Sequence, residues 1–259
     1  MDFNKSKVKW ISDYYGNPTA YYPLKVPGVT TVIQEMIPDP TWDEFVKEVG
    51  EEKANKIIND AWNRGKAMHL FIENYTKEFS KTKDKQIALQ HSQLISPNLL
   101  IKDNIPLDKI DKGREMFLNF YYSDYSTLYE DLIGSELSLY SPILFYRGKT
   151  DIFYNEKGVG RVVTDFKTSS KPIEKGSIKE LKYKRQLGGY ALALEHMLKD
   201  KNITINKASI LVVQTKSTDI QEIFCVNKEL EEQKQEFKTL ITEYHIKHDQ
   251  SYLIDGFNK

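Results

Sequence analysis

The sequence has one cysteine, no excess of charge of either sign and no long apolar stretch. Cys225 alone cannot form an intramolecular disulfide or a four-cysteine zinc or iron–sulfur site. Because 37 basic residues balance 37 acidic ones, net charge gives no support for a polyanionic partner, although a local basic groove can lie on a neutral protein. No apolar run could span a membrane, and the first residues lack the apolar core of a secretory signal. We therefore expect a cytoplasmic protein with no membrane partner.

The 259 residues are enough for one large domain or two small ones, and we find no linker or internal repeat. Helical periodicity covers residues 41–79, 107–124, 177–199 and 228–248, and extended patterns cover 133–168, 208–214 and 220–226. We predict a single α/β domain, with a mainly helical part over 1–130 and a sheet-containing core over 131–259. Residues 80–106 have weak periodicity, and they are either a solvated connection or a lid over a substrate strand.

The stretch from Glu136 to Tyr190 organises the chain. Asp151 ends one short extended run and Asp165-Phe166-Lys167 ends the next, with a turn between them, which predicts a β-hairpin. Because strand side chains alternate, Asp165 and Lys167 point the same way and Phe166 points into the core. Two acids and a lysine at strand ends can hold a divalent cation and stabilise charge on a phosphate.

Two helices carry polar pairs at a spacing of four, which places each pair on one helix face. His69 and Glu73 form the first pair, and Gln186 and Tyr190 form the second. A lone histidine on a helix is usually a satisfied surface or core residue, and the second pair could simply pack on the sheet. Between Gln186 and Tyr190 lie Gly188 and Gly189, which are unfavourable in a helix unless another group approaches closely.

Five blocks of sequence, in order, resemble the PD-(D/E)xK nuclease superfamily, and within it the RecB-like exonuclease branch. That branch includes mitochondrial genome maintenance exonucleases and similar phage proteins. The core of the resemblance is the G-x-x-D followed by D-x-K, present here as Gly148 to Asp151 and as Asp165 to Lys167. The acidic strand of the family is present as Glu136, and its Q-x-x-x-Y helix as Gln186 to Tyr190.

The other two blocks lie in the N-terminal part. The G-x-x-x-H-x-x-x-E helix is present from Gly65 through His69 to Glu73. The early S-V-T motif is present as Gly28-Val29-Thr30-Thr31, which departs from the family at its first position. The resemblance implies a restriction-endonuclease-like core, with a central mixed β-sheet flanked by helices and preceded by a helical part.

The resemblance also implies roles for individual residues. His69, Asp151 and Asp165 would hold the metal together with the Phe166 carbonyl, and Mg²⁺ or Mn²⁺ suits such a site. Glu136 would orient a water or a second ion. Lys167 would position or activate the attacking water, while Gln186 and Tyr190 would hold the backbone or the water in line.

A basic stretch follows the second acid and could track the phosphates of a strand. Its members are Lys171, Lys175, Lys179, Lys182, Lys184 and Arg185. We predict DNA contacts for Lys171, Lys182 and Arg185, and also for Thr30 and Thr31 of the early block. The alternative is a solvated helix face, which charge runs usually are.

Three functions remain open at this point. The first is a metal-dependent DNA exonuclease that trims single-stranded ends or flaps in replication, recombination or repair, working with proteins of those processes in a bacterial cell or, if phage-encoded, in its host. The second is a catalytically silent fold that binds DNA or a protein, although the acids and the lysine at 151, 165 and 167 are intact. The third is an endonuclease. Because helicase motifs are absent, we expect a stand-alone nuclease.

Overall fold

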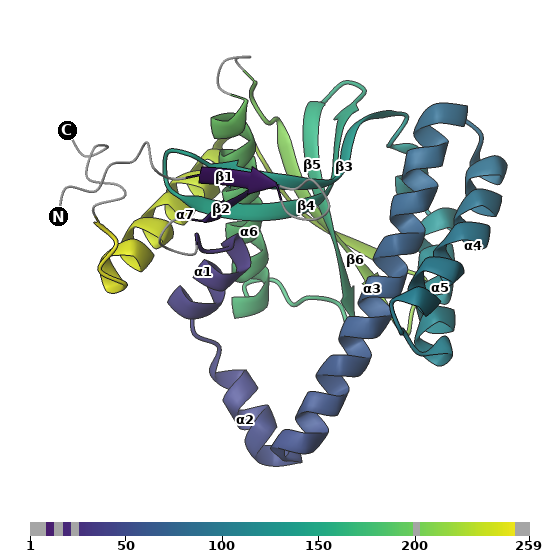
Figure 1. The fold of residues 1–259 in the computed structure, drawn as a ribbon, viewed down its shortest axis with the longest axis horizontal. Coiled ribbons are helices and arrows are strands. Elements are labelled where there is room, and N and C mark those ends of the chain that lie inside the picture. Colours follow the sequence, from purple (N-terminus) through teal and green to yellow (C-terminus); the bar gives the residue numbers. More distant parts are fainter. Residues whose placement is uncertain (1–8, 13–17, 22–25, 199–202, 252–259) are drawn as a thin grey trace.

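The structure is a computed structural model that describes residues 9–12, 18–21, 26–198 and 203–251 (Figure 1). Its helices are α1 (Val29–Met36), α2 (Pro40–Val49), α3 (Glu51–Thr82), α4 (Lys85–Lys102), α5 (Leu107–Tyr122), a 3₁₀ turn (Asp124–Thr127), α6 (Ile178–Met197) and α7 (Asn227–Lys247). Its strands are β1 (Lys9–Ser12), β2 (Pro18–Tyr21), β3 (Asp131–Ser141), β4 (Tyr146–Glu156), β5 (Gly160–Ser169), β6 (Lys207–Gln214) and β7 (Ile220–Val226).

The central sheet has five strands in the order β3-β4-β5-β6-β7. The first three form an antiparallel meander, and β7 is antiparallel to β6. β5 and β6 are parallel, because the chain crosses over through α6 between them. The sheet is therefore mixed, as predicted, and the predicted strands and helices of residues 131–259 are confirmed.

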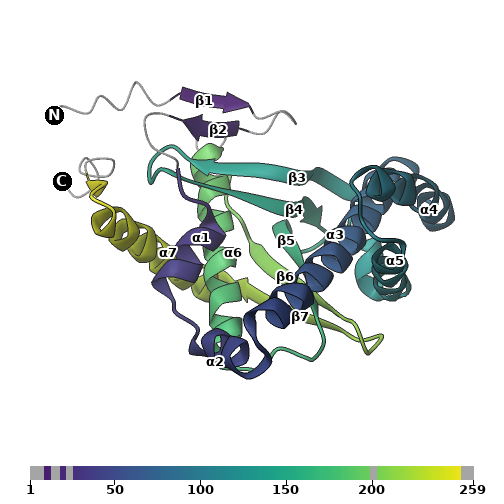
Figure 2. The same cartoon turned by 60° about the horizontal axis from the view of Figure 1, so that its bottom comes forward.

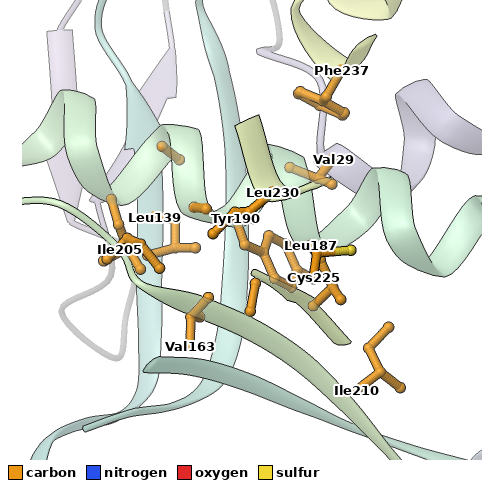
Figure 3. Packing of buried hydrophobic residues seen from close by; sticks show 14 of the residues in the cluster. Val29, Leu139, Val163, Leu187, Tyr190, Ile205, Ile210, Cys225, Leu230 and Phe237 are labelled. Carbon is orange, nitrogen blue, oxygen red and sulfur yellow. The ribbon is translucent and has the colours of Figure 1, made fainter. Parts of the chain in front are cut away.

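Helices cover both faces of this sheet (Figures 1 and 2). Helices α1, α6 and α7 pack on one face, where Val29, Leu187, Tyr190 and Phe237 belong to one buried cluster (Figure 3). Helices α3 and α5 pack on the other face around a second buried cluster that includes Phe166. Among the helices of the described ranges, none has the length and apolar character needed to cross a membrane.

Helix α4 occupies the weakly periodic segment. Asp84 caps its N-terminus by accepting hydrogen bonds from the two amides that follow Lys85. The helix lies against α3, where the Ser92 hydroxyl donates to the Phe71 carbonyl at 2.7 Å and the Asn74 amide donates to the Ser96 hydroxyl at 3.0 Å. The segment thus forms a regular helix over most of its length. Its use as a lid stays a prediction.

The glycine pair of α6 meets α7, which confirms the predicted close approach. A Cβ on Gly188 would lie well inside van der Waals contact with the Gln233 carbonyl, and one on Gly189 would lie 3.0 Å from the Phe237 ring. The two helix backbones therefore approach closely at a point where any side chain would hold them apart. This contact holds α6, the helix that carries Gln186 and Tyr190, against α7.

We predict that Gly188→Ala destabilises the protein by about 1–3 kcal/mol in urea unfolding, because α7 must move to admit the new methyl group. At an ordinary helix position the same change stabilises by about 1 kcal/mol. Gly65→Ala in α3 is the matched control, since its Cβ would meet nothing closer than the Thr168 hydroxyl at 3.7 Å. Stabilisation by Gly188→Ala would show that α6 and α7 do not meet there.

Candidate active site

Neighbouring strands bring the two aspartates together. Asp151 and Asp165 lie inside β4 and β5, and not at strand ends as predicted, because both strands continue beyond them. The pairing of β4 with β5 nevertheless stops beside the two aspartates, at Ile152 and Thr164. The Phe166 amide donates to Asp151 Oδ2 at 2.6 Å, which ties the first carboxylate to the backbone beside the second. Asp165 is buried, and the Lys167 ammonium forms an ion pair with its Oδ2 atom. Phe166 lies in the second core cluster, so the predicted alternation along β5 is confirmed.

Helix α3 brings His69 to these strands. His69 Nδ1 lies 3.2 Å from Asp151 Oδ1, and the imidazole meets the edge of the Phe166 ring with centroids 6.1 Å apart. Gly65 lies one turn earlier and faces Thr168 of β5. A Cβ at this glycine would be in ordinary van der Waals contact with the Thr168 hydroxyl, at 3.7 Å, so α3 passes beside the end of β5. The histidine is therefore held at the point where β4 and β5 separate.

Strand β3 supplies a third acid. Its neighbours Ser135 and Leu137 pair with β4 on either side of Asp151, so Glu136 lies across from that aspartate. One ligand atom each from His69, Glu136 and Asp151 lie within 4.8 Å of one another. The resemblance gave Glu136 a role beside the metal ligands, whereas the structure places its carboxylate among them. Asp165 lies next to this group, engaged by Lys167.

Glu136 has a backbone conformation that a side chain disfavours. Its φ is +53°, in the left-handed region, inside a β-strand. Such a conformation costs a non-glycine residue about 1–2 kcal/mol and persists where the surrounding structure imposes it. Here the kink turns the carboxylate toward His69 and Asp151, and an ion pair with Lys149 holds it.

We predict that the free energy of unfolding in urea is about 1 kcal/mol higher for Glu136→Gly than for Glu136→Ala, because only glycine accepts this φ freely. Both variants lose the carboxylate and its contact with Lys149. The difference in stability between them therefore reports the cost of the backbone conformation alone. The neighbouring change Ser135→Gly, compared with Ser135→Ala, serves as the control and should show the reverse order. If Glu136→Ala were instead more stable than Glu136→Gly, as expected at position 135, the backbone at Glu136 would be unstrained.

Charge in the site is unevenly compensated. Burial raises the pKa of Asp165 to about 6, with Lys167 opposing the rise and Asp151 adding to it. Burial and Asp151 also raise the pKa of Glu136, against the effect of Lys149. For Asp151 the burial that would raise its pKa is outweighed by His69 and Lys167, so its pKa is lowered. Burial is thus the main reason why the pKa values of Asp165 and Glu136 are raised, although each carboxylate has a basic partner.

The basic groups that contact the two aspartates have raised pKa values. Burial would lower the pKa of His69, but Asp151 outweighs it and the pKa is raised. Burial would likewise lower the pKa of Lys167, while Asp165 and Asp151 raise it above its ordinary value. Lys167 is therefore an ammonium at any physiological pH.

The predicted pair on α6 lies under the strands. The Gln186 amide donates to the Tyr190 hydroxyl at 2.9 Å, and both side chains are buried. A Cβ on Gly148 would lie 2.9 Å from the Tyr190 ring, so that glycine lets the tyrosine reach β4. Burial, with Asp165 and Asp151 adding to it, holds the pKa of Tyr190 well above its usual range. The phenol is thus neutral and close to both aspartates.

The predicted DNA contacts do not all lie together. Thr30 and Thr31 are exposed in the first turn of α1, and Lys171 is exposed after β5. Lys182 forms an ion pair with Asp39 at 3.6 Å. Arg185 points to α7 instead, where its guanidinium donates to Gln233 and, at 3.0 Å, to Glu236. A phosphate at Arg185 would have to displace those contacts.

An open cavity of about 460 Å³ lies over the acids. Its lining includes Trp62, Lys66, His69, Glu136, Asp151 and Lys167. Trp62 is 61% exposed, and the Lys66 ammonium lies 5.4 Å from the centre of its indole ring. These features could contact a base and a phosphate of a strand that enters the cavity.

Sequence reasoning missed several residues of the site. Lys149 is two residues before Asp151, which puts it on the same face of β4, where it pairs with Glu136. Tyr183 is seven residues before Tyr190, on the same helix face, and its pKa is raised to about 12 by burial, against the opposing effect of Lys167. Spacing alone could have indicated both. Trp62 and Lys66 stand seven and three residues before His69 on α3, so they share its helix face and the same spacing could have indicated them.

Comparison with known proteins identifies the family. The family model described as the PD-(D/E)XK nuclease superfamily matches residues 45–252. The chain belongs to the PD-(D/E)XK nuclease superfamily. The match spans every residue of the site, from His69 on α3 to Tyr190 on α6. The predicted superfamily and its fold are therefore confirmed, and the site described above lies in a nuclease fold.

Curated proteins give no significant match. Among solved structures, the chain is similar to a candidate exonuclease from Eubacterium rectale, at 13% identity and a TM-score of 0.42, over 71% of this chain and 68% of that one. It is also similar to SSO0001, at 15% identity and a TM-score of 0.27, over 66% of this chain and 73% of that one. At such low TM-scores neither likeness bears on the function.

The donors present fit a divalent metal. Two carboxylates and an imidazole converge at His69, Glu136 and Asp151, and the buried Asp165 adds a further acid beside them. Carboxylate oxygens suit Mg²⁺ and Mn²⁺, and Mn²⁺ also accepts an imidazole. A cation placed among these acids would offset the burial and the repulsion from Asp151 that together raise the pKa values of Asp165 and Glu136.

Proposed function

We propose that this protein is a metal-dependent DNA exonuclease that hydrolyses phosphodiester bonds at single-stranded ends or flaps. The observation that carries the proposal is the convergence of His69, Glu136 and Asp151 beside the Asp165–Lys167 pair, in a cavity open to a strand. Membership of a nuclease superfamily supports phosphodiester hydrolysis. The DNA substrate and the exonuclease mode rest on the RecB-like sequence blocks.

His69, Glu136, Asp151 and Asp165 would hold Mg²⁺ or Mn²⁺, with the Phe166 carbonyl as a further oxygen. Such a metal supplies a nucleophile near neutral pH and polarises the scissile phosphate. The His69 proton must leave for the imidazole to serve as a ligand. The Asp151 carboxylate then loses its imidazolium partner and becomes free for the cation.

Lys167 would act as a fixed positive charge. Because Asp165 and Asp151 raise its pKa, the ammonium keeps its proton and donates hydrogen bonds to a non-bridging phosphate oxygen. This preorganised charge stabilises the pentavalent transition state more than the ground state. We favour this role over activation of the water, which the resemblance left as an alternative.

Gln186 and Tyr190 would position the attacking water. Their mutual hydrogen bond is buried, and the neutral phenol lies near Asp151 and Asp165. Phosphoryl transfer depends mainly on in-line positioning and electrostatics, so a rigid pair below the reacting centre suits this role. Tyr183, close to Lys167, would limit the positions that the ammonium can take.

The alternatives are an endonuclease and a silent DNA-binding fold on the same scaffold. The intact acids and Lys167 support a working enzyme. The exposed Trp62 indole at the cavity edge favours contact with an unpaired base. Proteins of replication or recombination would be its partners if it trims ends in those processes.

The test uses one single-stranded DNA labelled at its 5′ end, the same DNA labelled at its 3′ end, and a closed single-stranded circle. Each is incubated with Mg²⁺, Mn²⁺ or EDTA. We expect metal-dependent release of short products from one labelled end and an intact circle. The labelled end that is released first gives the polarity of digestion.

Cutting of the circle would replace the exonuclease by an endonuclease. Binding of the DNA without cutting, in either metal, would favour the silent fold. Lys157→Ala should digest these substrates as wild type does, because Lys157 is exposed in the β4–β5 turn, away from the cavity. This variant shows that loss of a surface charge does not by itself change the activity.

A further inference from the structure

A second cavity of about 350 Å³ lies between α3, α5 and the β6–β7 turn. Its polar lining includes Arg64, Lys112, Glu115, Thr215, Lys216 and Thr218. Three of these residues are basic and one is acidic, so the lining has a positive balance. Hydroxyl groups and the Asn119 amide supply the remaining polar groups of the lining. A cavity with this chemistry suits an anion.

Arg64 is the unusual member of this lining. Its Nε atom is buried and has no hydrogen-bond partner among the described residues. No carboxylate of the described ranges forms an ion pair with Arg64, since the nearby Asp60 pairs with Lys109 at 3.1 Å. By contrast, Lys112 in the same lining pairs with Glu115 at 3.0 Å. Buried donors almost always have a partner, so Arg64 has hydrogen-bonding capacity beside the cavity that the described residues do not use.

The second cavity adjoins the active site through two neighbouring pairs of residues. Arg64 precedes Gly65, which lines the catalytic cavity. On the sheet, the Thr215 amide donates to the Ser169 carbonyl at 2.9 Å, and Ser169 follows Thr168 of the catalytic lining. The two cavities therefore lie on either side of the contact between α3 and the end of β5.

We propose that the Arg64 cavity binds a backbone phosphate of the same DNA strand that is cleaved, away from the scissile bond. The proposal rests on the proposed function, because it takes the strand in the active site as the source of the phosphate. The guanidinium fork matches the geometry of phosphate oxygens, and Lys216 and the threonine hydroxyls complete the donor set. Contact at this second point fixes the register of the strand, so that one chosen bond lies at the metal site.

The test combines a scan of the substrate with a charge-removing variant. Single phosphates of a DNA strand are replaced, one position at a time, by uncharged methylphosphonates, and kcat/KM is measured for wild type and Arg64→Gln. We expect wild type to lose about tenfold or more at one position away from the cleaved bond. Arg64→Gln should lose a similar factor on unmodified DNA and should be insensitive to the replacement at that position.

Two controls separate the phosphate contact from general effects. Arg161→Gln removes an equal charge at the opposite end of β5, where Arg161 pairs with Asn155, and should leave the scan unchanged. In salt titrations of binding, Arg64→Gln should lower the slope of log K against log salt by about 0.7, as expected for one lost contact with a single strand. Arg64→Lys, which keeps the charge, should restore that slope. Thermal unfolding checks that each variant is folded.

The outcomes distinguish the inference from the proposed function. If DNA is cleaved but wild type and Arg64→Gln give the same methylphosphonate profile, the inference is wrong and the function stands. If wild type neither binds nor cleaves DNA, the proposed function fails, and a DNA strand is excluded as the source of the phosphate in the Arg64 cavity. Thermal stabilisation by inorganic phosphate, present in wild type and lost in Arg64→Gln, would then assign the cavity to a free anion.

Discussion

Lys167→Ala is expected to lower the single-turnover cleavage rate by about 10²–10³-fold while leaving DNA affinity nearly unchanged. The ammonium is a preorganised charge beside the reacting phosphate, and removal of one such donor typically has an effect of this size on the rate. It makes a single contact among many to the strand, so binding depends on it little. Rates with saturating enzyme, and dissociation constants from fluorescence anisotropy, measure the two quantities separately.

The design of this experiment includes a folding control. Lys167→Ala leaves the buried Asp165 without its ion-pair partner, which could disturb the local structure. Lys167→Gln keeps a side chain of similar length and should reduce the rate to the same extent. Lys157→Ala should behave as wild type. Parallel losses of rate and affinity in both variants would place Lys167 in strand binding and not in the chemical step.

The affinity for Mn²⁺ is expected to fall steeply as the pH is lowered from 7 to 5.5. Asp165 has a pKa of about 6, raised mainly by burial, and His69 has a pKa raised by Asp151 against the effect of burial. Both groups must lose their protons before they can serve as ligands, so protons compete with the metal. The affinity should fall about tenfold per pH unit for each proton displaced, and the combined slope should exceed one.

The sign of this dependence follows from the direction of each shift. Both groups hold their protons more tightly in the folded, metal-free protein than in a model peptide, so metal binding becomes weaker as the pH falls through their pKa values. His69→Gln should reduce the slope by about one proton while lowering the affinity overall. A calorimetric titration at several pH values measures this. An affinity independent of pH over the whole range would mean that the metal binds elsewhere.

Much of the site follows from local spacing. Alternation along β5 predicts that Asp165 and Lys167 share a face and that Phe166 enters the core, because a strand has a period of two whatever surrounds it. The glycines of α6 predict a close neighbour for the same kind of reason, since a helix does not retain two glycines at its centre without a packing need. Sequence order then places β3, β4 and β5 side by side as a meander.

Other features depend on long-range packing and could not be predicted. The direction of Arg185 depends on which side of α6 faces α7, and the contact at Gln233 is 48 residues away in sequence. The left-handed conformation of Glu136 is imposed by the pairing of β3 with β4, and no local pattern indicates it. The Arg64 cavity forms only when α3, α5 and the β6–β7 turn meet.

The central claim is that the acids at the junction of β3, β4 and β5 form a metal-dependent centre for phosphodiester cleavage. The most direct test is the cleavage rate of end-labelled single-stranded DNA as a function of Mn²⁺ concentration, for wild type, Asp151→Asn and Asp131→Asn. Asp131 lies at the far end of β3, where it pairs with Asn155, and serves as the matched control. We expect saturable cleavage by wild type and Asp131→Asn, and a rate at least about 10³-fold lower for Asp151→Asn, because loss of the ligand removes several kcal/mol of charge stabilisation. Equal, metal-dependent cleavage by all three proteins would contradict the account.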